Sequence, residues 1–453
     1  MALKVLILVG GETTGTRFRP LTMDEPKLLF PICGKPLISH IIDSLVEQLS
    51  PTNGLEILLM GFFKDSSKFQ AYVKHANDTY PDLKIEYLSE PEAMGTAGGL
   101  YHFRDKIFTD ADSKVLMIHG DVICNYPFKD MLKANLEQKS NITILGIDPV
   151  SLIKTPRIQV SNGGGEGNTL PSDEELLQNY GAIVANKNDC GVIHYVEKPS
   201  SKISMFRQDT TYSILLNGGI YIFDRSILDL LQEAKVSKER GATFDFEEED
   251  LDNELDKSDS LSLELDVFKI LPSIKQTKFS VYKSNDFWYQ LKTPVSALLA
   301  NSLFLSQGPC NGGNFDNIEI LKPVQIGNSD LSNSSSSKIG PNVSIGNNVT
   351  LGKGVRLSNC IIADDVTIGD NTIIKNAIVS RGAIIGKWCR LEGTITAETL
   401  AQNVNVVSGY LKLLNNIVIL CQGTTVANQV FVYNSVVLPH KELKKDVKYE
   451  IIM

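Results

Sequence analysis

The chain has 453 residues, of which 42% are hydrophobic and 21% are charged, and its formal net charge is −9. A chain of this length exceeds what one hydrophobic core usually serves, so we expect at least two domains. The acidic balance, without a basic stripe, excludes a nucleic-acid-binding surface, and no run of about 18 apolar residues predicts a membrane span.

The cysteines and the start of the chain indicate the compartment. Seven cysteines lie far apart without a Cys-x-x-Cys pair, at positions Cys33, Cys124, Cys190, Cys310, Cys360, Cys389 and Cys421. An odd number at such spacing suits a reducing compartment, and we interpret them as buried thiols. The apolar opening is too short for a signal peptide. We therefore expect a soluble, cytoplasmic protein.

Short β-branched runs alternate with helical patterns through the first 150 residues. The runs at 4–9, 56–62, 84–88 and 114–119 predict strands, whereas the apolar spacing in 35–48 and 66–75 predicts helices. Strands separated by helices are typical of a mostly parallel sheet. Ligands of such sheets lie at the carboxyl ends of the strands.

A glycine-rich stretch follows the first predicted strand. Glycines allow positive φ, so that successive N–H groups can converge on phosphate oxygens, and nearby cations complete the site. The pattern matches neither the dinucleotide fingerprint nor the Walker loop. A turn whose arginines only face water is the simpler alternative. The candidate phosphate-binding residues are Gly10, Gly11, Gly15, Thr16, Arg17, Arg19 and Lys27.

Two further stretches of this region are candidates for the site. The small residues around Gly95, Thr96 and Gly98 permit close approach of a flat base, although an ordinary helix start has the same composition. Asp121 follows the strand predicted at 114–119 and can hold Mg²⁺ against phosphates. A lone aspartate at a strand end is more often a turn former, but the phosphate loop favours a metal ligand.

The motif Gly-Gly-x-Gly-Thr-Arg-x-x-Pro-Leu followed by Pro-Lys resembles the signature of sugar-nucleotide pyrophosphorylases, which join a nucleoside triphosphate to a sugar 1-phosphate. The Asn-Tyr-Gly motif at 179–181, Tyr-Val-Glu-Lys-Pro at 195–199 and Leu-Asn-Gly-Gly-Ile-Tyr at 216–221 follow in the order of that family. The resemblance implies a Rossmann-like α/β nucleotidyltransferase domain over residues 1–305. It also implies base and ribose contacts at 95–99 and sugar contacts from Gly181, Glu197, Lys198 and Asn217.

Two departures from the family pattern bear on catalysis. Glu12, Thr13 and Thr14 stand where active members usually have one residue, which places a negative charge near the phosphates. Gln290 stands two residues after Trp288, where active members carry an aspartate that joins the strand-end carboxylate on Mg²⁺. We therefore expect Mg²⁺ to bind weakly or not at all, and the chain to be catalytically poor on its own.

From residue 321 the sequence changes to a six-residue period of aliphatic residues, often followed by glycine. Such hexapeptide repeats predict a left-handed parallel β-helix over 321–453, after a linker at 306–320. Residues 392–416 interrupt the period and predict a protruding loop. Hexapeptide acyltransferases need a histidine projecting from the coils, and only His440 follows residue 200, so we expect a role in assembly. Residues 161–177 resemble a flexible insertion and 245–256 a solvated acidic helix face.

Three stretches narrow the resemblance: Gly-Thr-Arg-Phe-Arg-Pro-Leu, Gly-Gly-Leu-Tyr-His-Phe-Arg-Asp at 98–105, and the ending at 434–443. They are similar to the GDP-mannose pyrophosphorylases, the mannose-1-phosphate guanylyltransferases, and among them to the regulatory alpha type. This implies GDP-mannose binding, self-association, and restraint of a catalytic beta-type homologue through the loop at 392–416. An active guanylyltransferase remains an alternative. A nucleotide-exchange-factor subunit of translation initiation is a more distant one, because it has a further appended domain.

Overall fold

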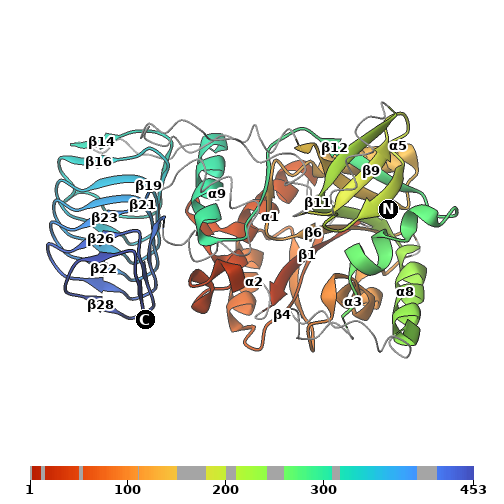
Figure 1. Cartoon of the computed structure of the whole chain (residues 1–453), viewed down its shortest axis with the longest axis horizontal. Coiled ribbons are helices and arrows are strands. Elements are labelled where there is room, and N and C mark those ends of the chain that lie inside the picture. Colours follow the sequence, from red (N-terminus) through yellow and green to blue (C-terminus); the bar gives the residue numbers. More distant parts are fainter. Residues whose placement is uncertain are drawn as a thin grey trace. The chain divides into compact units, whose positions relative to one another are not determined.

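A computed structural model describes residues 3–11, 16–49, 55–110, 112–149, 180–199, 211–241, 260–308, 317–394 and 416–453 (Figure 1). These residues form two compact units. The first lies within Met1–Thr14, Ile41–Lys154 and Ser172–Trp288, and the second within Gly15–His40 and Tyr289–Met453. Residues 16–40 and 289–305 thus group with the β-helix unit, whereas the sequence predicts them as part of the N-terminal domain.

The first unit is built on a mixed sheet. Its main path runs β10-β9-β11-β6-β1-β4-β5, and β8 joins β11 to β12. The strands of this sheet are β1 (Leu3–Gly11), β4 (Glu56–Phe62), β5 (Lys84–Ser89), β6 (Lys114–His119), β8 (Ile142–Ile147), β9 (Ala182–Asn186), β10 (Val192–Val196), β11 (Tyr212–Asp224) and β12 (Phe279–Ser284). The short strand β7 (Val122–Cys124) directly follows β6 in the chain, and β13 (Trp288–Gln290) spans the border between the units.

Parallel and antiparallel strands occupy different parts of this sheet. β1 pairs in parallel with both β4 and β6, and β4 with β5, so their carboxyl ends lie at one edge. The long strand β11 runs antiparallel to β6, β8 and β9. Helices of this unit are α1 (Leu37–Leu49, in large part), α2 (Ser67–Thr79), α3 (Gly95–His102), α4 (Arg104–Ile107), α5 (Phe128–Gln138), α8 (Ile227–Gly241), the π-helical turn η6 (Leu263–Phe268) and η7 (Leu271–Ser273).

The predicted α/β fold class is confirmed for this unit. Residues 56–62 and 114–119 form the predicted strands. β1 extends its predicted strand by one residue at the start and two at the end, and β5 extends its own by one residue. The buried core joins apolar side chains of β1, β6, β8 and β11 to those of α3 and η6. Core packing therefore fixes the position of the start of α3 and of η6, which both contribute to the site described below.

The second unit begins with three single-turn 3₁₀ helices and a small hairpin. These are η1 (Thr16–Phe18), η2 (Leu21–Met23), η3 (Lys27–Leu29), β2 (Pro31–Ile32) and β3 (Lys35–Pro36). The helix α9 (Pro294–Gln307) starts with a capping box between Thr293 and Ser296 and is buried on most of its surface. Its Asn301 accepts a hydrogen bond from the Cys33 N–H at 2.8 Å, and Phe304 stacks on His40. An apolar helix of this kind fits between two layers, and α9 contacts β2 and three β-helix strands.

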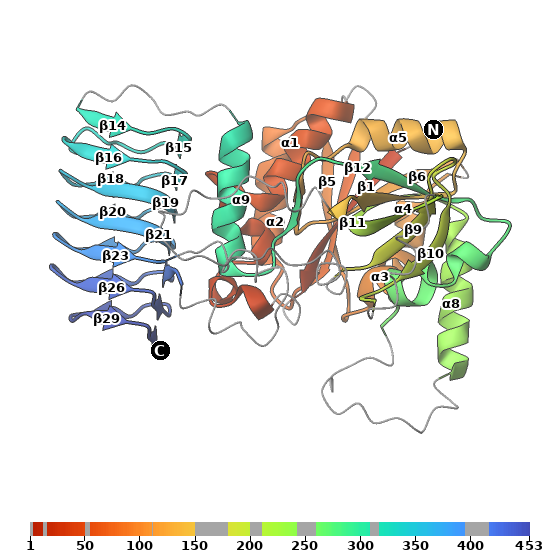
Figure 2. The same ribbon diagram turned by 45° about the horizontal axis from the view of Figure 1, so that its top comes forward.

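Short parallel strands stack into the left-handed parallel β-helix that the repeats predict (Figures 1 and 2). They are β14 (Ile318–Ile320), β15 (Val324–Ile326), β16 (Ser337–Ile339), β17 (Val343–Ile345), β18 (Thr350–Leu351), β19 (Arg356–Ile362), β20 (Thr367–Ile368), β21 (Ile373–Val379), β22 (Ile384–Ile385), β23 (Arg390–Glu392), β24 (Val418–Leu420), β25 (Thr425–Val426), β26 (Phe431–Tyr433), β27 (Val436–Val437), β28 (Glu442–Leu443), β29 (Val447–Lys448) and β30 (Ile451–Ile452).

The period of the repeat has a direct structural cause. Its aliphatic residues point into the coil and are at most 2% exposed: Ile339, Ile345, Leu351, Leu357, Ile362, Ile368, Ile374, Ile385 and Leu391. Several corners require a left-handed backbone, with φ of 55° at Asn348, 56° at Asn371 and 67° at Gly354. Each coil therefore buries its apolar face only against its neighbours.

The strand register locates the interruption of the repeat. Coils in the middle of the β-helix are offset by 17 residues, as for the contact between Asn347 and Asp364, but the contact between Lys387 and Asn428 spans 41 residues. Only the ends of the predicted loop at 392–416 are described, since 395–415 lie outside the described residues, as do 161–177 and 245–256.

The described cysteines differ in how deeply they are buried. Of the six described cysteines, four are buried, whereas Cys33 and Cys190 are only half-buried, so the expectation of uniformly buried thiols is wrong for these two. Both have a positive φ, Cys33 within a turn and Cys190 directly after one. Among the described residues, no helix combines the length and the apolar character needed to span a membrane.

Candidate functional site

The carboxyl ends of β1 and β6 lie side by side, as the sequence predicts. Leu8 is in register with His119, and the Gly120 N–H donates to the Leu8 carbonyl at 3.0 Å. Asp121 follows at once and is half-buried. The end of the first strand and the predicted metal ligand are thus neighbours at this edge.

The glycines of the predicted phosphate loop have a structural role in the sheet itself. A Cβ on Gly11 would lie 2.7 Å from the Phe62 carbonyl oxygen, and the Gly10 carbonyl packs directly against Gly61. Gly10 adopts a φ of 79°. Glycine is therefore required for the close approach of β1 and β4, whether or not a phosphate binds. Gly15 and the residues at 12–14 lie outside the described residues.

The cationic candidates of this motif belong to the second unit. Thr16 and Arg17 are exposed on η1. Lys27 lies on η3, where its Nζ donates to the Leu291 carbonyl at 3.2 Å. Gln290 lies one residue before that carbonyl. A role of Arg17 and Lys27 in phosphate binding stays a prediction.

The start of α3 is covered by residues 261–264 of the same unit. The N–H groups of Ala97 and Gly98 both donate to the Leu261 carbonyl, at 2.9 and 3.2 Å. Gly95 has a φ of 79°, and a Cβ there would lie 2.5 Å from the same carbonyl oxygen. Two amides that a helix start usually offers to an anion are therefore used within the chain. This accounts for the small residues at 95 and 98.

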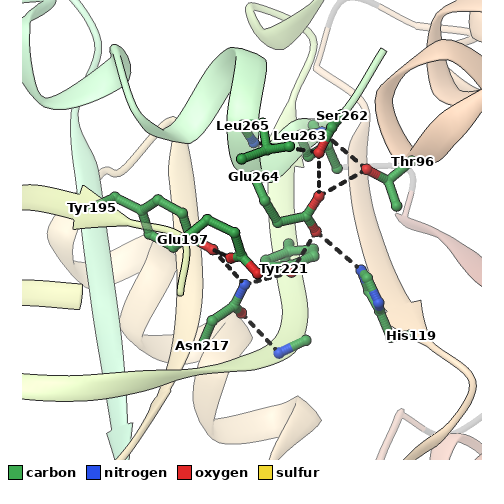
Figure 3. Close-up of polar contacts among 11 residues, drawn as sticks. Thr96, His119, Tyr195, Glu197, Asn217, Tyr221, Ser262, Leu263, Glu264 and Leu265 are labelled. Carbon is green, nitrogen blue, oxygen red and sulfur yellow. Dashed lines mark hydrogen bonds and ion pairs between the residues drawn. The ribbon is translucent and has the colours of Figure 1, made fainter. Parts of the chain in front are cut away.

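Two of the predicted sugar-binding residues, Glu197 and Asn217, meet in one network (Figure 3). The Tyr195 hydroxyl donates to Glu197 Oε2 at 2.8 Å, and Asn217 Nδ2 donates to the hydroxyls of Tyr195 at 3.1 Å and Tyr221 at 3.0 Å. Asn217 Oδ1 in turn accepts the Gly219 N–H at 2.9 Å. Lys198 is exposed, has a φ of 46° and makes none of these hydrogen bonds. The structure thus joins Glu197 to Asn217 through a buried tyrosine.

Gly181 packs directly against this network. Its carbonyl accepts the Asn217 N–H at 2.8 Å. A Cβ at this position would collide with the Tyr195 hydroxyl and would lie 2.7 Å from Glu197 Oε2. Only glycine fits here, which gives the Asn-Tyr-Gly motif a physical reason. The neighbouring Tyr180 packs edge-on against Trp288, whose Nε1 donates to the Gly218 carbonyl.

Glu264 is a carboxylate at the centre of the site that no motif of the sequence indicates. One of its oxygens accepts hydrogen bonds from the hydroxyls of Thr96 at 2.9 Å and Ser262 at 3.0 Å. The other accepts from the Tyr221 hydroxyl at 3.2 Å and lies 3.4 Å from His119 Nε2. Four segments of the chain therefore meet at one side chain that is 14% exposed (Figure 3).

Glu264 and His119 form a charged pair. The 3.4 Å separation is long for a hydrogen bond, and Nε2 has no hydrogen-bond partner in the described part of the chain, so the contact is an ion pair. Burial raises the pKa of Glu264, but His119 and the hydrogen bonds outweigh it and lower this pKa to about 2. Burial lowers the pKa of His119, but Glu264, with Asp121 and Glu197, raises it above its ordinary value.

The side chains around Asp121 offer few of the ligands that Mg²⁺ requires. The ion usually takes one or two carboxylates together with substrate phosphates. Within the described ranges, no three His, Cys, Asp or Glu side chains cluster in a way that could hold a metal. A histidine that its neighbours favour as a cation stands two residues before Asp121. This donor set does not fit an ion that stays bound without substrate.

A second carboxylate that the sequence did not single out is Glu90, which follows β5. Among the described residues its Oε1 is buried without a hydrogen-bond partner, and it packs against Gly99, with Met60 on the same side. Burial raises the pKa of Glu90 to about 7. Neither Glu90 nor Glu264 belongs to a motif with a recognisable spacing, and only the ends of the strands and helices near them could have indicated their place.

Known proteins are similar to both parts of this chain. The family model described as nucleotidyl transferase matches residues 4–152 and 158–259, and the model described as GMPPB C-terminal domain matches residues 321–452. A probable mannose-1-phosphate guanyltransferase of Schizosaccharomyces pombe is 35% identical over 457 residues, covering 100% of both chains. The mannose-1-phosphate guanylyltransferase regulatory subunit alpha of Xenopus tropicalis is 32% identical over 468 residues, again covering 100% of both.

Proposed function

Because the chain belongs to the mannose-1-phosphate guanylyltransferase family, we propose that it is a regulatory subunit that binds GDP-mannose and restrains a catalytic beta-type homologue. Several full-length relatives carry the name regulatory subunit alpha, and a regulatory subunit implies a catalytic partner. The proposal includes assembly with such a homologue and with further copies of this chain.

The observation that carries GDP-mannose binding is the fixed position of Glu197. Its Oε2 accepts the Tyr195 hydroxyl at 2.8 Å, and Gly181 leaves space for that contact. A carboxylate held in this way is prepared to accept hydrogen bonds from sugar hydroxyls. Each such bond contributes about 0.5–1.5 kcal/mol net, and more when one partner is charged. Asn217 supports the site indirectly, since both of its amide hydrogens already bind tyrosines.

Weak catalysis is the second part of the proposal. Of the two carboxylates that active members use for Mg²⁺, this chain keeps only Asp121. Gln290 stands in place of the second and offers an oxygen without a charge. Metal ions stabilise such transition states by several kcal/mol, and each loss of about 1.4 kcal/mol lowers the rate tenfold. We expect turnover at least about 100-fold below that of an active enzyme.

Calorimetry on the purified full chain tests the binding. We expect GDP-mannose to bind with a Kd below about 1 mM, equivalent to about 4 kcal/mol. Glu197→Gln should weaken binding about tenfold, because a sugar hydroxyl then loses a charged acceptor. Glu92→Gln, at an exposed position, is the matched control and should bind as the wild type does. No heat of binding at millimolar GDP-mannose would contradict the proposal.

An active guanylyltransferase is the second candidate, and the name of the Schizosaccharomyces pombe relative favours it. The two candidates differ in the turnover of GTP and mannose 1-phosphate by the isolated chain. Turnover near 10 s⁻¹, about the median for enzymes, would favour this candidate and exclude the regulatory role. If turnover is low, Gln290→Asp should raise it, because the second carboxylate is then restored.

A further inference from the structure

A continuous path of hydrogen bonds leads from the sugar side of the site to the start of α3. We name it the Glu197–Glu264 relay; it consists of Glu197, Tyr195, Asn217, Tyr221 and Glu264 (Figure 3). Its four bonds measure 2.8, 3.1, 3.0 and 3.2 Å in that order. The path crosses from β10 through β11 to η6, which are distant in sequence. Both tyrosine side chains are fully buried.

The direction of every bond in the relay is fixed. Both ends are carboxylates, which accept only, and the amide of Asn217 in the middle donates to both sides. The Gly219 N–H donates to Asn217 Oδ1 at 2.9 Å, which excludes the flipped amide. Each tyrosine hydroxyl therefore accepts from Asn217 and donates to its own carboxylate. No member can reverse its bond without leaving a buried polar atom unpaired, which costs about 1–3 kcal/mol.

The far end of the relay holds the start of α3. Glu264 accepts the Thr96 hydroxyl at 2.9 Å, and that hydroxyl accepts the Leu263 N–H at 2.9 Å. The neighbouring Leu261 carbonyl takes the N–H groups of Ala97 and Gly98. A change in the position of Glu264 must therefore move either Thr96 or the segment that covers α3. This is the stretch to which the family resemblance assigns the base and ribose.

We propose that the Glu197–Glu264 relay couples the sugar subsite to the nucleotide subsite, with Tyr221 and Glu264 acting as positioning residues that touch neither half of the ligand. This inference rests on the proposed function. A sugar hydroxyl that donates to Glu197 changes the strength of the bond that the Tyr195 hydroxyl donates to the same carboxylate. Chains of hydrogen bonds transmit such polarisation to their next members. Because coupling between two sites is reciprocal, an ordered α3 also favours the sugar-binding arrangement of Glu197.

The test compares GDP with GDP-mannose, because the ratio of their dissociation constants isolates the contribution of the mannosyl group. Tyr221→Phe removes one hydroxyl and interrupts the relay, while both end carboxylates stay in the chain and Glu264 keeps its bonds from Thr96 and Ser262. We expect it to weaken GDP-mannose binding about tenfold and GDP binding by less than about twofold. Glu264→Gln should weaken both ligands, since it also loosens Thr96. The double variant should match Glu264→Gln alone, because the two residues act in one path.

Tyr80→Phe is the matched control. The Tyr80 hydroxyl also donates to a carboxylate, Asp43, but it has no bond to the relay. We expect it to leave the ratio of the two dissociation constants unchanged. If the melting temperature shows that Glu264→Gln does not fold, Thr96→Val takes its place. Thr96→Val removes the hydroxyl that donates to Glu264, so we expect it to weaken the binding of both ligands as well.

The outcomes separate the inference from the proposed function. A wild type that binds no GDP-mannose overturns both. If the wild type binds GDP-mannose, two results overturn the coupling alone. In one, Tyr221→Phe weakens the binding of GDP and of GDP-mannose by equal factors, and in the other it weakens the binding of neither. Additive effects in the double variant would also contradict it, because Tyr221 and Glu264 would then act independently.

Discussion

Two carboxylates of the first unit have pKa values that are shifted in opposite directions, because their surroundings differ. Glu264 is surrounded by hydroxyl donors and His119, and its pKa falls to about 2 although burial alone would raise it. Glu90 has a buried oxygen without any donor, and burial raises its pKa to about 7. The chain therefore stabilises the charge of Glu264 and disfavours that of Glu90.

Glu90→Gln should stabilise the protein at alkaline but not at acidic pH. The folded-state pKa of about 7 lies above the ordinary value of 4.5, so the contribution of Glu90 to stability is greatest below pH 4.5 and is lost as pH rises through 7. The amide carries no charge, so we expect a gain of about 1–2 kcal/mol at pH 8, discounted for partial exposure, and little change at pH 4.5. Urea unfolding at the two pH values measures this. Equal effects at both would contradict the account, with Glu92→Gln as the control.

Gly181→Ala should disrupt sugar binding more than folding. The new methyl group would collide with the Tyr195 hydroxyl and lie 2.7 Å from Glu197 Oε2, so this contact has to open. We expect GDP-mannose binding to weaken about tenfold or more and stability to fall by about 1–3 kcal/mol. Gly308→Ala is a suitable control, because its Cβ would meet only the Phe304 carbonyl at 3.4 Å. Unchanged affinity in Gly181→Ala would show that Tyr195 does not position Glu197.

The residues of the site were only partly predictable from the sequence. Short motifs indicated Glu197, Asn217 and Gly181, and the structure brings these three together. Glu264 could not be predicted, because its place in the site depends on a contact with Thr96, which is 168 positions away in the chain. The motif also did not show that Asn217 holds two buried tyrosines in place instead of offering its amide hydrogens to the sugar.

Among the elements, the β-helix was the most predictable part of the fold. An aliphatic residue at every sixth position has one structural explanation, because each side chain fills the interior of a coil. The antiparallel strand β11 was less predictable, since its apolar residues at 214–216 and 220–223 do not reveal strand direction. Strand direction depends on partners far away in sequence, whereas the repeat depends on near neighbours.

Ile374→Ala should destabilise the β-helix unit by about 2–5 kcal/mol, because it leaves a cavity in a coil that has few ways to collapse. Ile374 is 0% exposed, and its neighbours Leu357 and Leu391 are in register above and below it. Lys375→Ala, at an exposed position of the same strand, is the control and should change stability by less than about 0.5 kcal/mol. Chemical unfolding measures both variants. A similar loss in the two would contradict the coil-filling role.

For the whole molecule, the insertion into the β-helix is the feature most open to a regulatory test. Its ends meet: a Cβ on Gly393 would lie 2.6 Å from the Cα of Ile417. Residues 395–415 can therefore be replaced by a short glycine linker without changing the register of β23 and β24. We expect this deletion to preserve assembly with a catalytic homologue and to raise its turnover or weaken its feedback inhibition. Unchanged turnover and inhibition in an assembled complex would exclude a regulatory role for this segment.

The most direct test of the central claim is the rate at which a catalytic beta-type homologue makes GDP-mannose from GTP and mannose 1-phosphate, measured with and without this chain over a series of GDP-mannose concentrations. If the chain is a regulatory subunit, its presence lowers the rate increasingly as GDP-mannose rises, and the Glu197→Gln variant shifts that response to higher GDP-mannose. A rate that is independent of this chain at every GDP-mannose concentration, in a complex shown to assemble, would contradict the account.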